Sequence, residues 1–547
     1  MSAGLFEAAA RTLFGGLLSS VADEMLETLV RTAFSPNIKE RRDASTAVFD
    51  GRGRLVAQAA AIPVHLGAMP LSVEAALSAF GSWRAGDVVA LNDPFRGGTH
   101  LPDLTTVSPV FAEGEDRPVA YLAARAHHAD VGGATPGSMP LARDIYEEGL
   151  RIPPIRLVEA GEAVAPVWEL ILANVRTPEE RSGDLEAQIA CHRTGERRMD
   201  EAILRHGADE LARQVEGLLD YGERLMRSVI ERIPDGDYGF EDVLDGDGMG
   251  TTRIPIRVRI GIRGDQATVD FTGSAPECQG GVNAVLAVTR SAVLYVFLGL
   301  LVTPWEGSPG LPDPPLNAGC FRPIRVVACE GTVVNARPPR AVAAGNVETS
   351  QRIVDVVLGA LASALPGIIP AASQGTMNNL ALGGIDPRRG APFAFYETIA
   401  GGTGATPHAD GRDAVHSHMT NTWNTPAEAL ELAYPLRVER YEIRRGSGGR
   451  GIHRGGDGVV REIRALAPCA GTFLAERRRF PPYGIQRGEP GACGRDAIVR
   501  GEAREEIPPK VRLDLAPGDL LSIATPGGGG WGSPDDSGGS ARSRPPG

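Results

Sequence analysis

The chain has 547 residues, 42% hydrophobic and 23% charged, which is the balance of an ordinary soluble globular protein with several domains. Its 69 glycines and 42 prolines indicate many turns and shaped loops rather than a helical bundle. The net charge of −12, with no basic stripe between aromatic residues, argues against a nucleic-acid partner. The most apolar run, Ser291 to Thr303, is shorter than the ~20 residues that span a bilayer. It predicts a buried core helix, and no membrane partner is expected.

The cysteines and the N-terminus both favour a cytoplasmic protein. Glu7 and Arg11 interrupt the apolar stretch that a secretory leader needs. No CxxC pair occurs, so the cysteines are expected to be reduced thiols. There are six of them, namely Cys191, Cys278, Cys320, Cys329, Cys469 and Cys493.

The N-terminal third combines one helix with several strands. Leucines and valines recur every three or four residues up to about Ala33, which predicts a helix. From Ala47 to Val110 the chain reads as short strands separated by turns. The expected strands are TAVFD, GRLVAQ, GDVVALND and DLTTVSPVF, followed by PVAYLAARAHH, which leads into a Gly-rich loop.

Helices and strands alternate in longer blocks after this point. Asp184 to Arg232 has the period of a long helix or a helical hairpin. RIPIRVRIGI and QATVDFTG alternate apolar and polar residues and predict a β-hairpin. Helices are expected at Asn283 to Val302 and at Glu348 to Ala364, and short strands predominate from Tyr434 onward.

These blocks predict an α+β fold with more than one core. We expect an N-terminal α/β region that carries a candidate metal site, a helical connector, a central α/β region with polar loops, a β-rich C-terminal region and a disordered tail. The expected boundaries are 1–183, 184–238, 239–433, 434–532 and 533–547.

The first polar cluster lies between NDPFRGGTHLPD and RAHHAD. His127 and Asp130 follow a predicted strand, and Asp103 ends another loop. Imidazole and carboxylate ligands suit Zn or Mn, and an open coordination position would activate water or polarise a carbonyl. Alternatively, Asp93 and Asp103 cap turns and the histidines are ordinary hydrogen-bonded loop residues. Gly97-Gly98-Thr99 lacks the Lys-Ser/Thr ending of a Walker A loop, so no nucleotide site is predicted.

A second polar cluster runs from His416 to Asn424 and contains His418 and Asn421. The segments Asn346 to Ser350 and Ser373 to Asn379 are similarly polar and flanked by glycine. Such side chains could orient an amide or carboxylate ligand, or they could satisfy buried loop backbone. The residues alone leave both interpretations open.

Many long motifs resemble the hydantoinase B family, in the same order and over about Leu5 to Gly532. They include NDPFRGGTHLPD, HHADVGG, EEGLRIPP, NVRTPEERSGDLEAQIAC, PLNAGCFRPI, GNVETSQRIVDVVLGAL, SQGTMNN and HMTNTWNTPAE. The family includes the B component of N-methylhydantoinase, the C-terminal half of ATP-dependent 5-oxoprolinase, and the α-type subunits of acetone and acetophenone carboxylases.

The resemblance implies a hydrolase that works with a partner. A hydantoinase A-type ATPase would bind ATP and phosphorylate the substrate carbonyl, and this chain would complete ring opening of a hydantoin or 5-oxoproline type of cyclic amide. A hetero-oligomer is therefore expected. The alternatives are an α-type subunit of an ATP-dependent ketone carboxylase, which would need bicarbonate and a ketone, and a non-catalytic scaffold for the ATPase.

The resemblance also implies the site residues. The HxxD pair of the carboxylase metal site corresponds to His127 and Asp130, and Asp103 is the expected upstream carboxylate. His100, His128 and Glu148 are the candidates for a fourth ligand of Zn or Mn. We expect Glu148 in the ligand set and His128 as general base or as a group that holds a ligand. The ring amide would be held by Asn346, Glu348, His416, His418 and Asn421.

Overall fold

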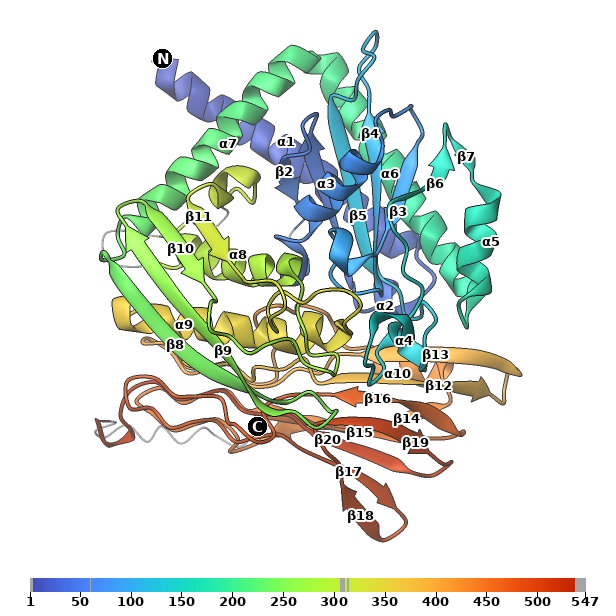
Figure 1. Cartoon of the computed structure of the whole chain (residues 1–547), viewed down its shortest axis with the longest axis vertical. Coiled ribbons are helices and arrows are strands. Elements are labelled where there is room, and N and C mark those ends of the chain that lie inside the picture. Colours follow the sequence, from blue (N-terminus) through green and yellow to red (C-terminus); the bar gives the residue numbers. More distant parts are fainter. Residues whose placement is uncertain (1–2, 60, 305–309, 312–313, 537–547) are drawn as a thin grey trace.

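The computed structural model describes residues 3–59, 61–304, 310–311 and 314–536. The described strands form four sheets of seven, four, four and five strands. Figure 1 shows the seven-stranded sheet above two stacked C-terminal sheets, with the smaller green sheet beside it. The expected α+β fold class is confirmed.

The N-terminal sheet has the order β2-β1-β5-β4-β3-β6-β7 and is antiparallel throughout. Strands β1 to β5 are the predicted ones. The strands of this sheet are β1 (Ala44–Asp50), β2 (Leu55–Gln58), β3 (Val88–Leu91), β4 (Asp103–Val110), β5 (Ala120–His127), β6 (Ile155–Glu159) and β7 (Glu162–Ala163).

Helices cover both faces of this sheet, because successive strand residues point to opposite sides. Leu122 and Ala124 of β5 pack against α1 and α6, whereas Tyr121 and Ala123 pack against α3. The predicted helical block is two helices, α6 and α7, that meet at Gly207 with φ +85°. The helices in this part are α1 (Ala3–Thr32), α2 (Pro36–Lys39), α3 (Met69–Ala79), α4 (Ile145–Glu148), α5 (Ala165–Ala173), α6 (Pro178–His206) and α7 (Ala208–Ile230).

The central sheet contains the predicted hairpin and one strand before it. Residues of β9 alternate between buried and exposed along most of the strand, as expected for a half-buried strand. Strand β11 pairs with β10 in parallel, and the other pairings are antiparallel. The strands are β8 (Gly236–Gly246), β9 (Thr252–Arg263), β10 (Gln266–Asp270) and β11 (Ile324–Val327).

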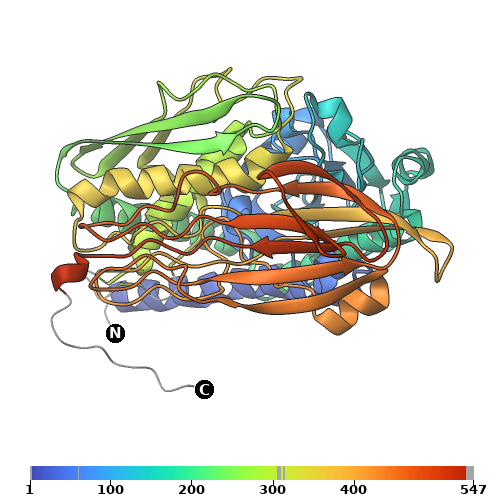
Figure 2. The same ribbon diagram turned by 90° about the horizontal axis from the view of Figure 1, so that it is seen from below.

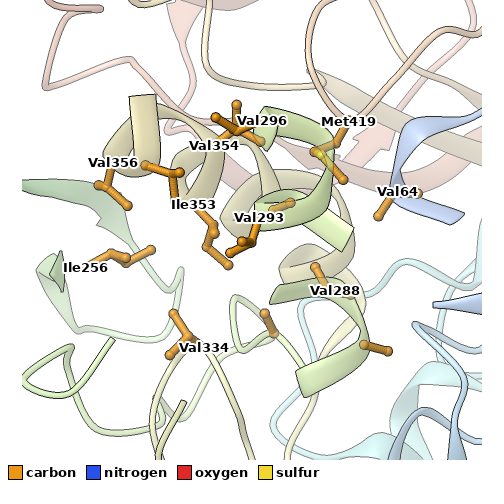
Figure 3. Packing of buried hydrophobic residues seen from close by; sticks show 14 of the residues in the cluster. Val64, Ile256, Val288, Val293, Val296, Val334, Ile353, Val354, Val356 and Met419 are labelled. Carbon is orange, nitrogen blue, oxygen red and sulfur yellow. The ribbon is translucent and has the colours of Figure 1, made fainter. Parts of the chain in front are cut away.

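Helices α8 (Leu286–Val302) and α9 (Ser350–Ala364) form the centre of the largest core. Figure 3 shows Val293 and Val296 of α8 close to Ile353 and Val356 of α9, with Ile256 of the sheet beside them. The predicted core helix is thus confirmed as α8. Within the described ranges, no helix is long and apolar enough to cross a membrane.

The C-terminal strands form two sheets that enclose a separate core, in which Phe395 and Phe473 of one sheet cluster with Ile463 and Leu521 of the other. Short α10 (Ala427–Ala433) lies between β13 and β14. One sheet contains β13 (Ala391–Glu397), β12 (Asn379–Asp386), β16 (Cys469–Leu474) and β19 (Lys510–Leu515). The other contains β14 (Leu436–Arg444), β15 (Gly458–Ala465), β20 (Leu520–Ala524), β17 (Arg495–Arg500) and β18 (Ala503–Glu506).

Glycine-rich loops extend from one end of these sheets and lie side by side (Figure 2). The Gly528 amide donates to the Gly456 carbonyl at 2.9 Å. A Cβ atom on Gly528 would lie 2.0 Å from the Thr403 carbonyl oxygen, so only glycine fits there. Of the tail that was expected to be disordered, Pro534–Asp536 form one 3₁₀ turn and residues 537–547 lie outside the described residues.

Candidate metal centre

Three predicted or candidate ligands come together at the ends of β4 and β5. One ligand atom from each of His100, Asp103 and His127 lies within 4.8 Å of the other two, and all three side chains are buried. Asp103 and His127 are cross-strand partners, so the sheet register sets their separation. His100 lies in the loop just before β4. The group has the composition and spacing of a site for a divalent transition metal.

Three of the four ring nitrogens of this cluster lack a hydrogen-bond partner among the described residues, and one of them, His100 Nε2, lies 3.3 Å from Asp103 Oδ2 within the cluster. Neither ring nitrogen of His100 nor Nε2 of His127 has a hydrogen-bond partner within the described part of the chain. Buried polar atoms are rarely left unpaired, so the cluster fits a bound cation. Burial holds the pKa of His127 well below its usual range, which keeps the imidazole in its neutral, ligating form. Burial raises the pKa of Asp103, but His100 and His65 outweigh it and hold that pKa well below 3.8.

Surrounding side chains fix the two strand ligands. The Tyr396 ring stacks on His127 with centroids 4.4 Å apart, and Asn37 Nδ2 lies 3.1 Å from His127 Nδ1. The Thr99 hydroxyl donates to Asp103 Oδ2 at 2.6 Å. Outer groups of this kind set the orientation of metal ligands.

The expected partners Asp130 and Glu148 lie elsewhere. Asp130 accepts hydrogen bonds from the Arg176 guanidinium and backbone amide, both at 2.7 Å. Glu148 Oε1 accepts from the backbone amides of Val342 and Ala343, both at 2.8 Å. Their positions are explained by these partners, so the structure does not bring either carboxylate into the cluster.

His128, the expected general base, points to the opposite face of the sheet from His127. Its Nε2 lies 3.0 Å from Gln188 Oε1 on α6. Burial lowers the pKa of His128 to about 4, with a further contribution from Arg181. Neighbouring residues at a strand end point in opposite directions, so the consecutive residues His127 and His128 cannot both direct their rings into one site.

Two of the expected substrate residues lie on the π-helical turn Gly345–Thr349 that precedes α9. Asn346 Nδ2 lies 3.4 Å from Asp103 Oδ2, and Asn346 Oδ1 has no partner in the described residues. Glu348 Oε1 accepts from Asn379 Nδ2 at 2.8 Å, and Tyr396 donates to Asn379 Oδ1 at 2.8 Å. Burial raises the pKa of Glu348 to about 7. The turn is therefore joined to the cluster of His100, Asp103 and His127 both directly and through Tyr396.

The HSHMTN segment divides between the interior and the surface. The side chain of His416 is partly buried and both of its ring nitrogens are inaccessible and without a hydrogen-bond partner among the described residues, and desolvation lowers its pKa to about 3. His418 Nε2 lies 3.6 Å from Asp355 Oδ1. Asn421 is exposed and donates to the Ala61 carbonyl at 3.3 Å. These three residues do not form one group.

Sequence reasoning missed two residues beside the cluster. His65 Nε2 lies 3.6 Å from Asp103 Oδ1, and its Nδ1 lies 2.9 Å from Ser45 Oγ. Asp43 is buried next to the charges of Arg41, Asp103 and His100, and burial raises its pKa to about 7. Asp43 precedes a short apolar stretch and His65 follows one. Both lie far from the HxxD motif in the sequence, so no local pattern linked them to it.

Comparisons with known proteins agree along the whole chain. A family profile described as Hydantoinase B/oxoprolinase matches residues 8–534. The B subunit of a putative D-/L-hydantoinase from a Pseudomonas species is 32% identical over 95% of this chain and 89% of its own length. The 5-oxoprolinase of Dictyostelium discoideum is 38% identical over 96% of this chain, but this chain covers only 40% of that protein.

Two solved structures share the fold. The ATP-dependent caprolactamase from Pseudomonas jessenii superimposes with a TM-score of 0.86 at 29% identity, over 98% of this chain and 92% of that one. A nucleotide-free acetone carboxylase gives a TM-score of 0.87 at 18% identity, over 96% of this chain and 76% of that one. The second likeness shows the fold alone.

Proposed function

Because the chain belongs to the Hydantoinase B/oxoprolinase family, we propose that it is the B-type subunit of an ATP-dependent amidohydrolase. Its substrate is a cyclic amide of the hydantoin or 5-oxoproline type, activated by a hydantoinase A-type ATPase that binds the ATP. The Pseudomonas hydantoinase relative is itself a subunit of similar length to this chain, which supports a separate partner and a hetero-oligomer. Six free cysteines fit a reducing cytoplasm.

The buried cluster of His100, Asp103 and His127, with its three ring nitrogens that lack a hydrogen-bond partner among the described residues, is the observation that carries this proposal. These residues would hold Zn or Mn, and Asp43, whose charge interacts with those of Asp103 and His100, is a further carboxylate candidate. Such a metal supplies Lewis-acid polarisation of a carbonyl or a more acidic bound water. Tyr396 and Asn37 keep the His127 ring in place, and Thr99 and His65 do the same for Asp103.

The turn before α9 holds the ring amide. Asn346 Oδ1 is a buried acceptor without a partner in the described residues, so it is free to accept from the ring N–H, and Glu348 Oε2 is also buried and unpartnered there. Glu348, with a pKa of about 7, also holds a proton near neutral pH that the leaving nitrogen needs. The buried surroundings exclude bulk water from the activated carbonyl.

Two adjacent histidines provide the test. His127→Asn removes a cluster ligand, whereas His128→Asn changes the same residue type on the other face of the sheet. We expect His127→Asn to lose bound Zn or Mn and ATP-dependent ring opening with the A-type partner. His128→Asn should retain its metal and most of its activity.

Metal content and ring opening are measured on the same samples, with 5-oxoproline and hydantoin as substrates. Full metal content in His127→Asn would contradict the proposed metal centre. Ring opening that survives loss of the metal would overturn the catalytic role and favour a scaffold. Ring opening by the chain alone, without ATP or partner, would contradict the assigned division of labour.

A further inference from the structure

Six arginines are among the largest fully buried side chains of the described residues, and four of them are paired with a carboxylate. Arg181, Arg352, Arg461 and Arg477 each make an ion pair with a carboxylate. The guanidinium of Arg41 instead donates to oxygens of Asn37, Tyr396, Thr398, Thr422 and Trp423. Arg125 is the sixth arginine among the fully buried side chains.

Arg125 has no ion pair and only two hydrogen bonds, both to hydroxyl groups. Its Nε donates to Thr105 Oγ1 at 2.8 Å and its Nη2 to Ser72 Oγ at 2.7 Å. Nη1 has no hydrogen-bond partner among the described residues, and the carboxylate whose charge acts on Arg125, Asp103, makes no ion pair with it. Leaving a buried charge unpaired is costly, so such a group is retained where something else pairs with it.

Arg125 lies beside the candidate metal centre, so a ligand that pairs with its guanidinium would lie there too. Arg125 and His127 are alternate residues of β5 and share a face, about 7 Å apart along the strand. Their cross-strand neighbours are Thr105 and Asp103. Ser45, which holds His65, is paired with Arg125 on the other side. Arg125 is therefore buried on the same face of the sheet as the cluster, and its charge interacts with those of Asp103 and His65.

The charges at this site require an anion once a cation is bound. Asp43 and Asp103 are matched in number by Arg41 and Arg125, and all four side chains are buried. A divalent metal would add two positive charges, whereas Glu348, the further buried carboxylate joined to the cluster through Asn379 and Tyr396, adds at most one negative charge. A dianionic ligand would restore neutrality, and a guanidinium is well suited to phosphate-like oxygens.

We propose that Arg125 forms an oxyanion subsite beside the metal cluster, which takes a phosphoryl group or another small dianionic oxyanion. This rests on the proposed function, since the phosphoryl group of the activated substrate is one source of the oxyanion. Free inorganic phosphate is the other source. Arg125 anchors the anion, while the cluster positions the reacting carbonyl next to it.

Inorganic phosphate is the probe. Calorimetric titration of the metal-loaded chain should detect phosphate binding, and Arg125→Gln should weaken it about tenfold or more with unchanged metal content, given the strength of charged hydrogen bonds. Ser72→Ala, which removes only one neutral partner of the guanidinium, should remain within about threefold of the original affinity. No phosphate binding by the fully metal-loaded chain, or equal affinity in Arg125→Gln, would overturn the subsite.

A measurement on the unsubstituted chain covers the case in which Arg125→Gln does not fold. With Mn in the cluster, paramagnetic relaxation of the ³¹P signal reports the distance between Mn and phosphorus. A distance within about 7 Å, the spacing of alternate strand residues, is expected. A distance well beyond that would place the phosphate elsewhere and overturn the proposal.

Ring opening with the A-type partner separates the sources and the two proposals. Phosphate that competes with the activated substrate identifies the substrate's phosphoryl group as the occupant, whereas non-competitive inhibition identifies released phosphate, and both support the subsite. Phosphate binding without ring opening would leave the subsite standing and defeat the proposed function. Ring opening with no phosphate binding would defeat the subsite alone.

Discussion

The two faces of the seven-stranded sheet are both buried and both carry histidines, but they differ in hydrogen bonding. On the face towards α6, His192 bonds Ser108 and Thr106, each at 2.8 Å, and His128 contacts Gln188. On the face towards α3, atoms of His100, His127 and Arg125 have no partner within the described residues.

This difference separates structural from functional polar residues. Paired buried groups add specificity and local stability. Unpaired groups cost free energy in the folded chain and point to a ligand that compensates for them. Burial and residue type alone do not distinguish the two faces, because His128 and His192 are as buried as His127.

The largest expected effect lies on the face towards α3. Asp103→Asn should lose metal and lower ring opening about 1,000-fold, because a metal contributes several kcal/mol to the barrier. Asp130→Asn is the matched control, since Asp130 pairs with Arg176 instead. Metal analysis and steady-state rates check both. A loss of metal in Asp130→Asn with Asp103→Asn unaffected would reverse the assignment of ligands.

The face towards α6 should respond in stability rather than activity. Gln188→Leu removes contacts with His128 and with the Leu104 and Ala124 carbonyls, which leaves buried groups unpaired. We expect a loss of about 1–3 kcal/mol in unfolding free energy. Denaturant unfolding measures this loss, and metal content should not change. Release of metal by this variant would mean that the two faces are coupled.

Stability should also depend on pH through Glu148. Burial raises its pKa from 4.5 to about 8, so between these values the folded state binds more protons than the unfolded state. This contribution to stability is therefore lost as the pH rises from 4.5 to 8, by at most about 1.4 kcal/mol per pH unit. Glu148→Gln keeps an acceptor for Val342 and Ala343 and should flatten the slope in unfolding experiments between these two pH values. An unchanged slope would exclude Glu148 as its source.

The smallest effect is expected at the surface. Asn421→Ala removes one 3.3 Å bond from an exposed side chain to the Ala61 carbonyl, so stability should change by about 0.5 kcal/mol or less. The KM for the cyclic amide should stay within about threefold, in contrast to Asn346→Ala, which removes a buried acceptor beside Asp103. A larger KM change at Asn421 than at Asn346 would move the substrate site to the surface loop.

Much of the fold could be predicted because its signals are local. Periodicity identified α1, the strands β1 to β5 and the β9–β10 hairpin, and the apolar run identified α8. The sequence left open whether the helical block is one long helix or a helical hairpin, and the structure divides it at Gly207. Strand β8 was not identified, although its burial alternates, because its acidic residues hide the apolar period.

The site was harder to predict because its members are far apart in the chain. Asp103 and His127 were expected together, and His100 was one of several candidates. Asp130 and Glu148 were equally good candidates by residue type. In the structure, however, Asp130 pairs with an arginine and Glu148 accepts hydrogen bonds from two backbone amides. Their partners come from distant segments that no spacing reveals.

The sequence by itself determined the family, the fold class and the presence of His and Asp residues clustered in loops, since long motifs and periodic patterns are properties of neighbouring residues. Only the tertiary structure decided which side chains meet. The register of β4 against β5 sets Asp103 opposite His127, and strand alternation sends His128 to the other face. It also left Arg125 buried without an ion pair among the described residues, because pairing depends on what the fold brings within a few ångströms of each group.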